Sequence, residues 1–166
     1  MPTKQQYDIF ISFPDSRMDS NGFKERTRSS HIAEKLYADL KRLGYNPFNS
    51  RSILGTGVQY VGEDFNKIIA DANDAASVLV LLCEDPNDLM KPYIVEEWMP
   101  YHISGKPIVP VMITNWSMSD IEPSKHPDDY PIFRLEAFHM YESDPMERQY
   151  RQLLDLIEQK YSVSTA

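Results

Sequence analysis

Apolar residues gather in five short runs along this chain. Two of the runs, VLVLLC (78–83) and PIVPVMI (107–113), are almost continuously apolar, which is typical of strands buried on both faces of a parallel sheet. The run YDIFISF (7–13) is rich in aromatic and β-branched residues, and weaker strands are predicted at 46–49 and 132–138. The pattern therefore predicts five strands.

Between these runs the apolar residues recur at three- and four-residue steps, which indicates amphipathic helices. Gly44 and Gly105 follow two of the apolar stripes and are predicted to end those helices. Ser29 or Ser30 is the predicted N-cap of the first helix. The four stripes cover residues 32–43, 65–72, 91–102 and 150–161.

Strands and helices alternate in the order β-α-β-α-β-α-β-loop-β-α. This order predicts an α/β fold of the flavodoxin-like, doubly wound type: a mostly parallel five-stranded sheet with helices on both faces. We expect one domain over residues 1–166, with its core at about 7–161, and long loops at 14–28, 50–61 and 114–131. Ligands bind such sheets beyond the carboxyl ends of the strands. The candidate positions there are Ser12–Phe13, Asn49–Ser50, Cys83–Asp85 and Thr114.

Composition narrows the possible functions. The net charge of −8 and pI near 4.9 argue against a nucleic-acid surface, which needs clustered Lys and Arg. Cys83 is the only cysteine, and the four histidines lack metal-ligand spacing, so we expect neither a disulfide nor a metal site. We find no apolar run of about 20 residues and no signal-peptide pattern, so a cytoplasmic protein without membrane contact is expected.

The stretch KPYIVEEWMPYH (91–102) places two glutamates side by side on a predicted helix. Successive helical residues point about 100° apart, so Glu96 and Glu97 cannot share a direction. Tyr93 and Tyr101 lie four residues on either side of Glu97, which puts Glu97 on the aromatic face and leaves Glu96 at the surface. A carboxylate on an aromatic face near a strand's carboxyl end is a candidate functional group.

Several stretches together resemble the Toll/interleukin-receptor (TIR) domains. YDIFISF (7–13) resembles the opening box of that family, and the segment from Gly62 to VLVLLC resembles its glycine-to-helix segment and following strand. The pattern from Tyr93 to Trp98 resembles its aromatic-x-x-x-Glu motif, and GKPIVPVMI (105–113) resembles its next strand. The resemblance covers roughly residues 7 to 160, in the family's order.

This resemblance implies an enzyme that cleaves NAD at the nicotinamide–ribose bond and releases nicotinamide with ADP-ribose or a cyclised isomer. It identifies Glu97 as the catalytic carboxylate and Tyr93 as the motif's aromatic residue. Ser12, Phe13 and Phe48 are expected to line the pocket with Tyr93. NAD is then the substrate, and no cofactor or metal is expected. Nicotinamide departs as a neutral base, so one carboxylate that stabilises the positive charge developing on the ribose meets the chemical demand.

The resemblance further implies self-association through TIR–TIR contacts that involve the 50–61 loop. It also implies a nucleotide signal read by a downstream effector in antiviral defence. Two alternatives remain open from the sequence. One is a non-enzymatic TIR–TIR interaction module, and the other is a nucleoside or nucleotide N-glycosidase that leaves NAD intact.

Overall fold

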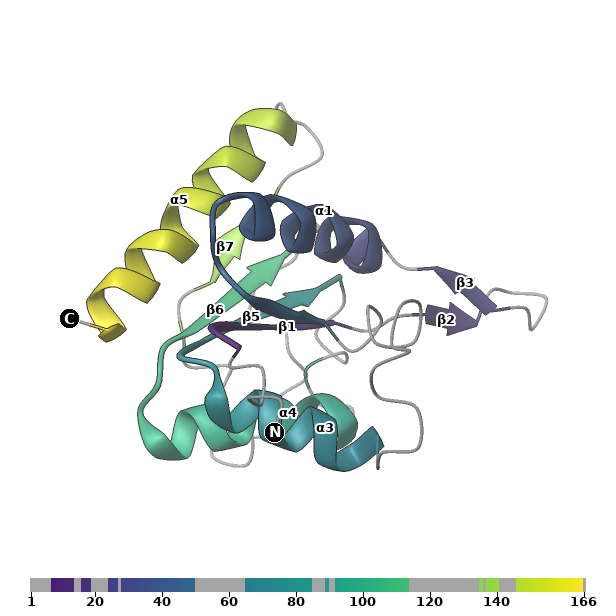
Figure 1. Cartoon of the computed structure of the whole chain (residues 1–166). Helices are drawn as coiled ribbons and strands as arrows, with labels where there is room; N and C mark the ends of the chain where they lie inside the picture. The colour runs from purple at the N-terminus through teal and green to yellow at the C-terminus, as the bar shows by residue number, and fades with distance from the viewer. Residues whose placement is uncertain are drawn as a thin grey trace.

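A parallel β-sheet forms the centre of the molecule (Figure 1). Its strand order is β4-β1-β5-β6-β7, and every pair of neighbours is parallel. The strands are β1 (Ile9–Ser12), β4 (Pro47–Asn49), β5 (Val78–Cys83), β6 (Ile108–Met112) and β7 (Phe138–His139). The computed structural model describes residues 7–13, 16–18, 24–26, 28–49, 65–84, 89, 92–113, 135, 137–140 and 146–165.

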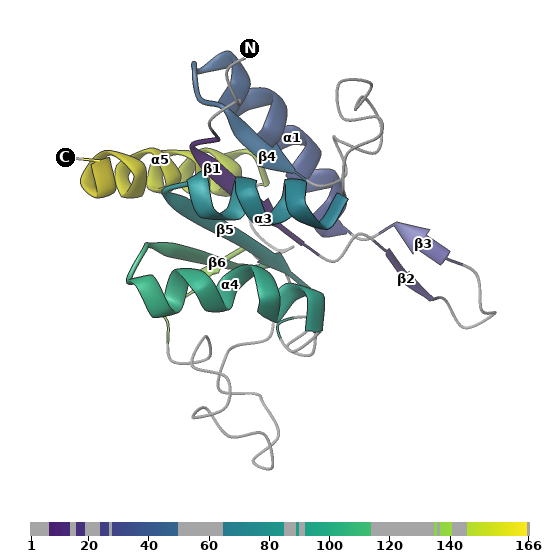
Figure 2. The ribbon, with the colours of Figure 1, turned by 60° about the horizontal axis from the view of Figure 1, so that its bottom comes forward.

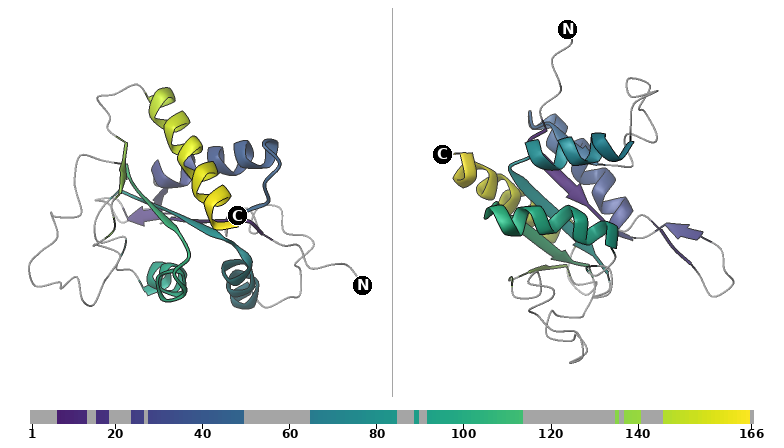
Figure 3. Two further views of the ribbon diagram at one scale, coloured as in Figure 1. Left: turned by 90° about the vertical axis from the view of Figure 1, so that its left-hand side faces the viewer. Right: turned by 90° about the horizontal axis from the view of Figure 1, so that it is seen from below.

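Helices cover both faces of this sheet, as Figures 2 and 3 show from other directions. Helices α1 and α5 lie on one face, and α3 and α4 lie on the opposite face. The predicted flavodoxin-like, doubly wound α/β fold is therefore confirmed. The four helices are α1 (Arg28–Arg42), α3 (Phe65–Ala75), α4 (Pro92–Ser104) and α5 (Met146–Thr165).

Alternation along the strands divides the core in two, because successive side chains point to opposite faces of a sheet. Ile9 and Ile11 of β1 belong to the cluster that packs against α1 and α5. Phe10 belongs to the cluster under α3 and α4, which also contains Trp98 and Tyr101. The apolar runs lack alternation because both of their faces are covered, as the sequence predicts.

The strand order reverses between β1 and β5. The chain passes from β1 outward to β4 and then crosses to the other side of β1, where Ser12 of β1 pairs with Leu81 of β5. In open α/β sheets this reversal leaves a crevice at the carboxyl edge, where ligands bind. The end of β1 therefore lies at the part of the sheet where this kind of fold binds ligands.

Glycines end two of the helices as predicted. Gly44 has a φ of 97°, and the Tyr45 amide donates to the Leu40 carbonyl at 3.0 Å. Gly105 has a φ of 76° and ends α4 in the same way. Only glycine adopts this left-handed conformation without strain, so each residue completes a Schellman-type cap.

The predicted serine cap at the other end of α1 is wrong. Helix α1 begins at Arg28, so Ser29 and Ser30 lie inside its first turn, and both are fully buried. The Ser29 backbone N–H donates instead to Oε1 of Glu84 at 2.8 Å. A buried carboxylate that follows β5 thus stands at the positive end of the α1 dipole, where a negative charge stabilises the helix.

The predicted loop at 14–28 contains an antiparallel hairpin that the sequence analysis missed. Strands β2 (Ser16–Met18) and β3 (Lys24–Arg26) pair with each other and project away from the sheet (Figures 1 and 2). Strand β7 starts at the last residue of the range 132–138 that was predicted for it. The predicted loops 50–61 and 114–131 lie outside the described residues. None of the described helices has the length and apolar character that crossing a bilayer requires.

Candidate active site

Ser12 and Glu97 meet at the carboxyl edge of the sheet. Ser12 is the last residue of β1 and is 2% exposed. Because it lies two residues after Phe10, its side chain points to the same face of the sheet, toward α3 and α4. Its Oγ donates a hydrogen bond to Oε2 of Glu97. The contact joins residues 85 positions apart in the chain at the point where the strand order reverses.

Helix α4 turns Glu97 inward and Glu96 outward. Ile94, Trp98 and Tyr101 are buried on the sheet-facing side of the helix. Glu97 stands three residues after Ile94 and four before Tyr101, so it shares that side and is partly buried, whereas Glu96 is exposed. The predicted separation of the two glutamates is therefore confirmed.

Hydrogen bonds from two aromatic side chains fix α4 in this orientation. The indole N–H of Trp98 donates to the Leu89 carbonyl at 3.0 Å, and the Tyr101 hydroxyl donates to the Asn73 carbonyl at 2.9 Å. Both rings are almost completely buried, so neither polar group has water as an alternative partner. The face that carries Glu97 is therefore held by its apolar packing and by these directional bonds together.

Burial changes the acidity of Glu97. Loss of solvation raises the pKa of its carboxyl group from 4.5 to about 7; the hydrogen bond from Ser12 opposes this rise, and the nearby charge of Glu96 adds to it. Both protonation states of Glu97 are therefore populated near neutral pH. A carboxyl group with a strongly perturbed pKa at a ligand-binding edge is characteristic of catalytic sites.

The two predicted phenylalanines lie in different parts of the core. Phe13 is 6% exposed and packs on the α1 and α5 side, so the sheet separates its side chain from Glu97. Phe48 lies on the Glu97 side but is 1% exposed, and its ring packs against Phe10 and Tyr7 at centroid distances of 5.1 and 4.8 Å. Both phenylalanines support the sheet that carries Ser12.

Tyr93 is the remaining predicted site residue. Its backbone belongs to the first turn of α4, one helical turn before Glu97. Its side chain lies outside the described residues, so its place in the pocket stays a prediction. Of the five predicted site residues, the structure brings Ser12 and Glu97 into direct contact.

Asn73 is a polar neighbour of Glu97 that the sequence analysis did not single out. It lies in α3, is 7% exposed, and its Nδ2 donates to the backbone carbonyl of Glu97 at 3.0 Å. Its position four residues after Ile69, on the apolar stripe of α3, was the available signal, because a polar residue on a buried helix face needs a specific partner.

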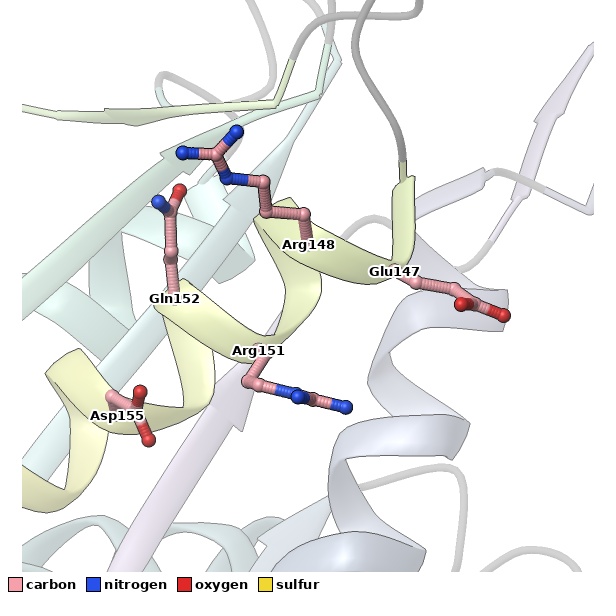
Figure 4. A pocket seen from close by; sticks show the side chains of 5 residues that line it. All are labelled: Glu147, Arg148, Arg151, Gln152 and Asp155. Atoms are coloured by element: carbon pink, nitrogen blue, oxygen red, sulfur yellow. The ribbon is translucent and has the colours of Figure 1, made fainter.

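The other polar groups that the structure describes are weaker candidates for a functional site. Within the described ranges, no three His, Cys, Asp or Glu side chains gather closely enough to hold a metal ion. An open depression on the surface of α5 is shown in Figure 4. All of its lining side chains come from that one helix, are exposed and polar, and include charges of both signs, as expected of a solvated helix face. They are Glu147, Arg148, Arg151, Gln152 and Asp155.

Comparison with protein-family models and with curated proteins gives no match for this chain. The interpretation of function therefore depends on the geometry around Glu97 and on the sequence motifs that lead to it.

Proposed function

We propose that this chain is a TIR-type NAD glycohydrolase or cyclase in which Glu97 is the catalytic carboxylate. The observation that carries the proposal is the contact of Ser12 with a partly buried Glu97 where the strand order reverses. The resemblance in sequence names the same glutamate independently of this geometry. The resemblance leads to Glu97 through its motif, and the geometry adds that this carboxylate, with a pKa shifted to about 7, lies at the edge where such folds bind ligands.

The chemistry of NAD fits a site with a single carboxylate. The bond to be broken joins ribose C1 to a positively charged nicotinamide ring, and nicotinamide takes the bonding electron pair and leaves as a neutral molecule. Positive charge then develops on C1 and the ring oxygen of the ribose. The carboxylate of Glu97 stabilises this charge, and partial exclusion of water strengthens the attraction.

Ser12 directs the carboxylate toward the substrate. Its hydroxyl holds Oε2 of Glu97, so Oε1 is the oxygen available to the ribose. Water that adds to C1 and loses a proton gives ADP-ribose, whereas a nucleophilic atom of the same dinucleotide gives a cyclic isomer. Binding of the cationic nicotinamide ring also favours the ionised form of Glu97, because an opposite charge nearby lowers a carboxyl pKa.

The test is release of nicotinamide from NAD by the purified protein, followed by chromatography over a range of protein concentrations with and without a crowding agent. Glu97→Gln keeps the shape of the side chain but cannot carry the charge, and we expect it to lower the rate by about a hundredfold or more. Glu96→Gln is the matched control, because Glu96 is the exposed neighbour. We expect it to keep the wild-type rate.

Two results would overturn the proposed cleavage of NAD. One is the absence of nicotinamide release under every condition of concentration and crowding, which would favour the non-enzymatic interaction module. The other is cleavage of nucleosides or nucleotide monophosphates with NAD left intact, which would identify an N-glycosidase that uses the same carboxylate. An active Glu97→Gln together with an inactive Glu96→Gln would assign catalysis to the neighbouring residue. Self-association, an effector in antiviral defence and a cytoplasmic location remain predictions from the sequence.

A further inference from the structure

Asn73 bonds helix α4 at two points. Its side-chain Nδ2 donates to the backbone carbonyl of Glu97 at 3.0 Å, and its own backbone carbonyl accepts from the Tyr101 hydroxyl at 2.9 Å. The two points on α4 are four residues apart, which is about one helical turn. Asn73 therefore spans the turn of α4 that follows the proposed catalytic carboxylate.

That turn of α4 contains Pro100. Proline has no backbone N–H, so the carbonyl of Glu96 loses the donor that a regular helix would provide four residues later, and the proline ring crowds the same carbonyl. The backbone of α4 is thus weakened next to Glu97. The amide of Asn73 supplies a donor from another helix to the very next carbonyl, that of Glu97.

The position of Asn73 leaves a buried polar atom without a hydrogen bond to any residue that the structure describes, which costs stability. Asn73 is 7% exposed, and among the described residues its buried Oδ1 has no hydrogen-bond partner. A buried acceptor without a partner destabilises a protein, whereas an apolar side chain of similar shape avoids the penalty. Natural proteins break such rules mainly at functional sites. Stability alone therefore does not explain why asparagine occupies position 73.

We infer that Asn73 is a positioning residue, which sets α4 against α3 so that the carboxylate of Glu97 meets the hydroxyl of Ser12. The catalytic consequence of this inference rests on the proposed function, but the geometric part does not require any substrate. Leucine at position 73 has nearly the shape of asparagine and no donor. It should leave the core filled and release the Glu97 carbonyl.

The test compares wild-type protein with Asn73→Leu by NMR titration of the glutamate side-chain carboxyl carbons, with the Glu97 signal assigned through Glu97→Gln. The groups that influence Glu97 are the Ser12 hydroxyl and the Glu96 carboxylate, together with Tyr101. The pKa of Tyr101 is itself raised by burial and by the charge of Glu97. We expect Asn73→Leu to fold with an unchanged or higher Tm and to lower the pKa of Glu97 from about 7 toward its ordinary value, as the carboxylate turns to water.

In the NAD assay, we expect Asn73→Leu to lower kcat by between about tenfold and a hundredfold with little change in KM, because a misplaced catalytic group loses rate and not substrate affinity. Asn73→Gln, which keeps an amide donor, should recover part of that rate. Tyr101→Phe is the matched control, because it removes the other bond between Asn73 and α4. It should reduce stability and shift the pKa of Glu97 less than Asn73→Leu does, because the donor to the Glu97 carbonyl remains in place.

The outcomes separate this inference from the proposed function. An unchanged Glu97 pKa and kcat in Asn73→Leu would overturn the positioning role. A shifted pKa in a protein that never cleaves NAD would support the positioning role and reject the proposed function. If Asn73→Leu does not fold, Asn73→Ala carries the same test, because it removes the donor without adding volume. Equal shifts of the Glu97 pKa in Asn73→Leu and Tyr101→Phe would mean that any bond between α3 and α4 has this effect. They would overturn a specific positioning role for the Asn73 side chain.

Discussion

At the scale of single residues, Glu97 couples the candidate site to the stability of the fold. Its pKa in the folded protein, about 7, lies above its ordinary value of 4.5, so the folded state holds the proton more tightly than the unfolded state does. The contribution of Glu97 to the free energy of unfolding therefore falls as pH rises from about 4.5 to about 7 and stays lower above that window. A side chain that destabilises the folded protein at neutral pH is more easily explained by function than by folding.

Glu97→Gln should consequently stabilise the protein at alkaline pH. We expect its free energy of unfolding to exceed that of the wild type by at most about 3 kcal/mol at pH ~8 and by almost nothing at pH ~4, because glutamine mimics the protonated acid. Urea denaturation at the two pH values measures the difference. The exposed Glu96→Gln should show a much smaller gain, because its charge is only a minor cause of the raised pKa of Glu97. A Glu97→Gln variant that is destabilised equally at both pH values would contradict the prediction.

Ser12 should set the pH at which the site becomes active. Its hydrogen bond lowers the pKa of Glu97 against the effect of burial, so Ser12→Ala should raise that pKa. If ionised Glu97 is the catalytic form, kcat/KM for NAD rises with pH to a midpoint near the pKa of Glu97 in the free enzyme, and the midpoint moves to higher pH in Ser12→Ala. The exposed serine variant Ser104→Ala is the control. A midpoint that stays in place or moves to lower pH in Ser12→Ala would reject the assignment.

The residue scale also shows where sequence reasoning succeeds. The 100° step of a helix separates Glu96 from Glu97 without any knowledge of the fold, because the geometry is local. The roles of Asn73 and Glu84 are different: each depends on a partner from another element, 24 and 55 residues away. Spacing along the chain contains no information about such partners.

At the scale of secondary-structure elements, the predictions that rest on long and continuous apolar patterns were right. The six-residue strand β5 and the helices rest on strong apolar patterns, and the structure confirms them. The hairpin β2–β3 consists of SRM and KER, two three-residue strands without apolar alternation, so its sequence resembles that of a polar loop. The N-terminal cap of α1 was misassigned because the group that stands there, Glu84, comes from the end of β5.

Glu84 should therefore contribute to the stability of α1. We expect Glu84→Ala to lower the free energy of unfolding by about 1–3 kcal/mol, because it leaves the buried Ser29 N–H without this acceptor. Glu84→Gln should cost about 1 kcal/mol or less, since it keeps an acceptor and loses only the charge at the helix dipole. Glu34→Gln, at an exposed position of the same helix, is the control. Thermal and urea unfolding would show whether Glu84→Ala is instead as stable as the wild type.

At the scale of the whole molecule, the fold class could be predicted because alternating strand and helix patterns leave few compact arrangements. The position of the site follows from one further feature, the reversal of strand order between β1 and β5. This reversal brings Ser12, near the start of the chain, next to the helix that carries Glu97. One fold supports many functions, so the assay of NAD cleavage, and not the fold, identifies the chemistry at that position.

The net charge of −8 leads to a prediction about assembly. Copies of an acidic protein repel one another, and salt screens that repulsion over about 10 Å at 0.1 M. If self-association completes the site, the rate of nicotinamide release per molecule rises with protein concentration, and added salt lowers the concentration needed. Light scattering at the same concentrations measures assembly directly, and the inactive Glu97→Gln should assemble as the wild type does, because the Glu97 side chain is partly buried. A rate per molecule that is independent of concentration would mean that one copy contains the complete site. If salt instead weakens both assembly and activity, the contacts between copies join opposite charges, and the basic residues of β2 and β3 become the first candidates for substitution.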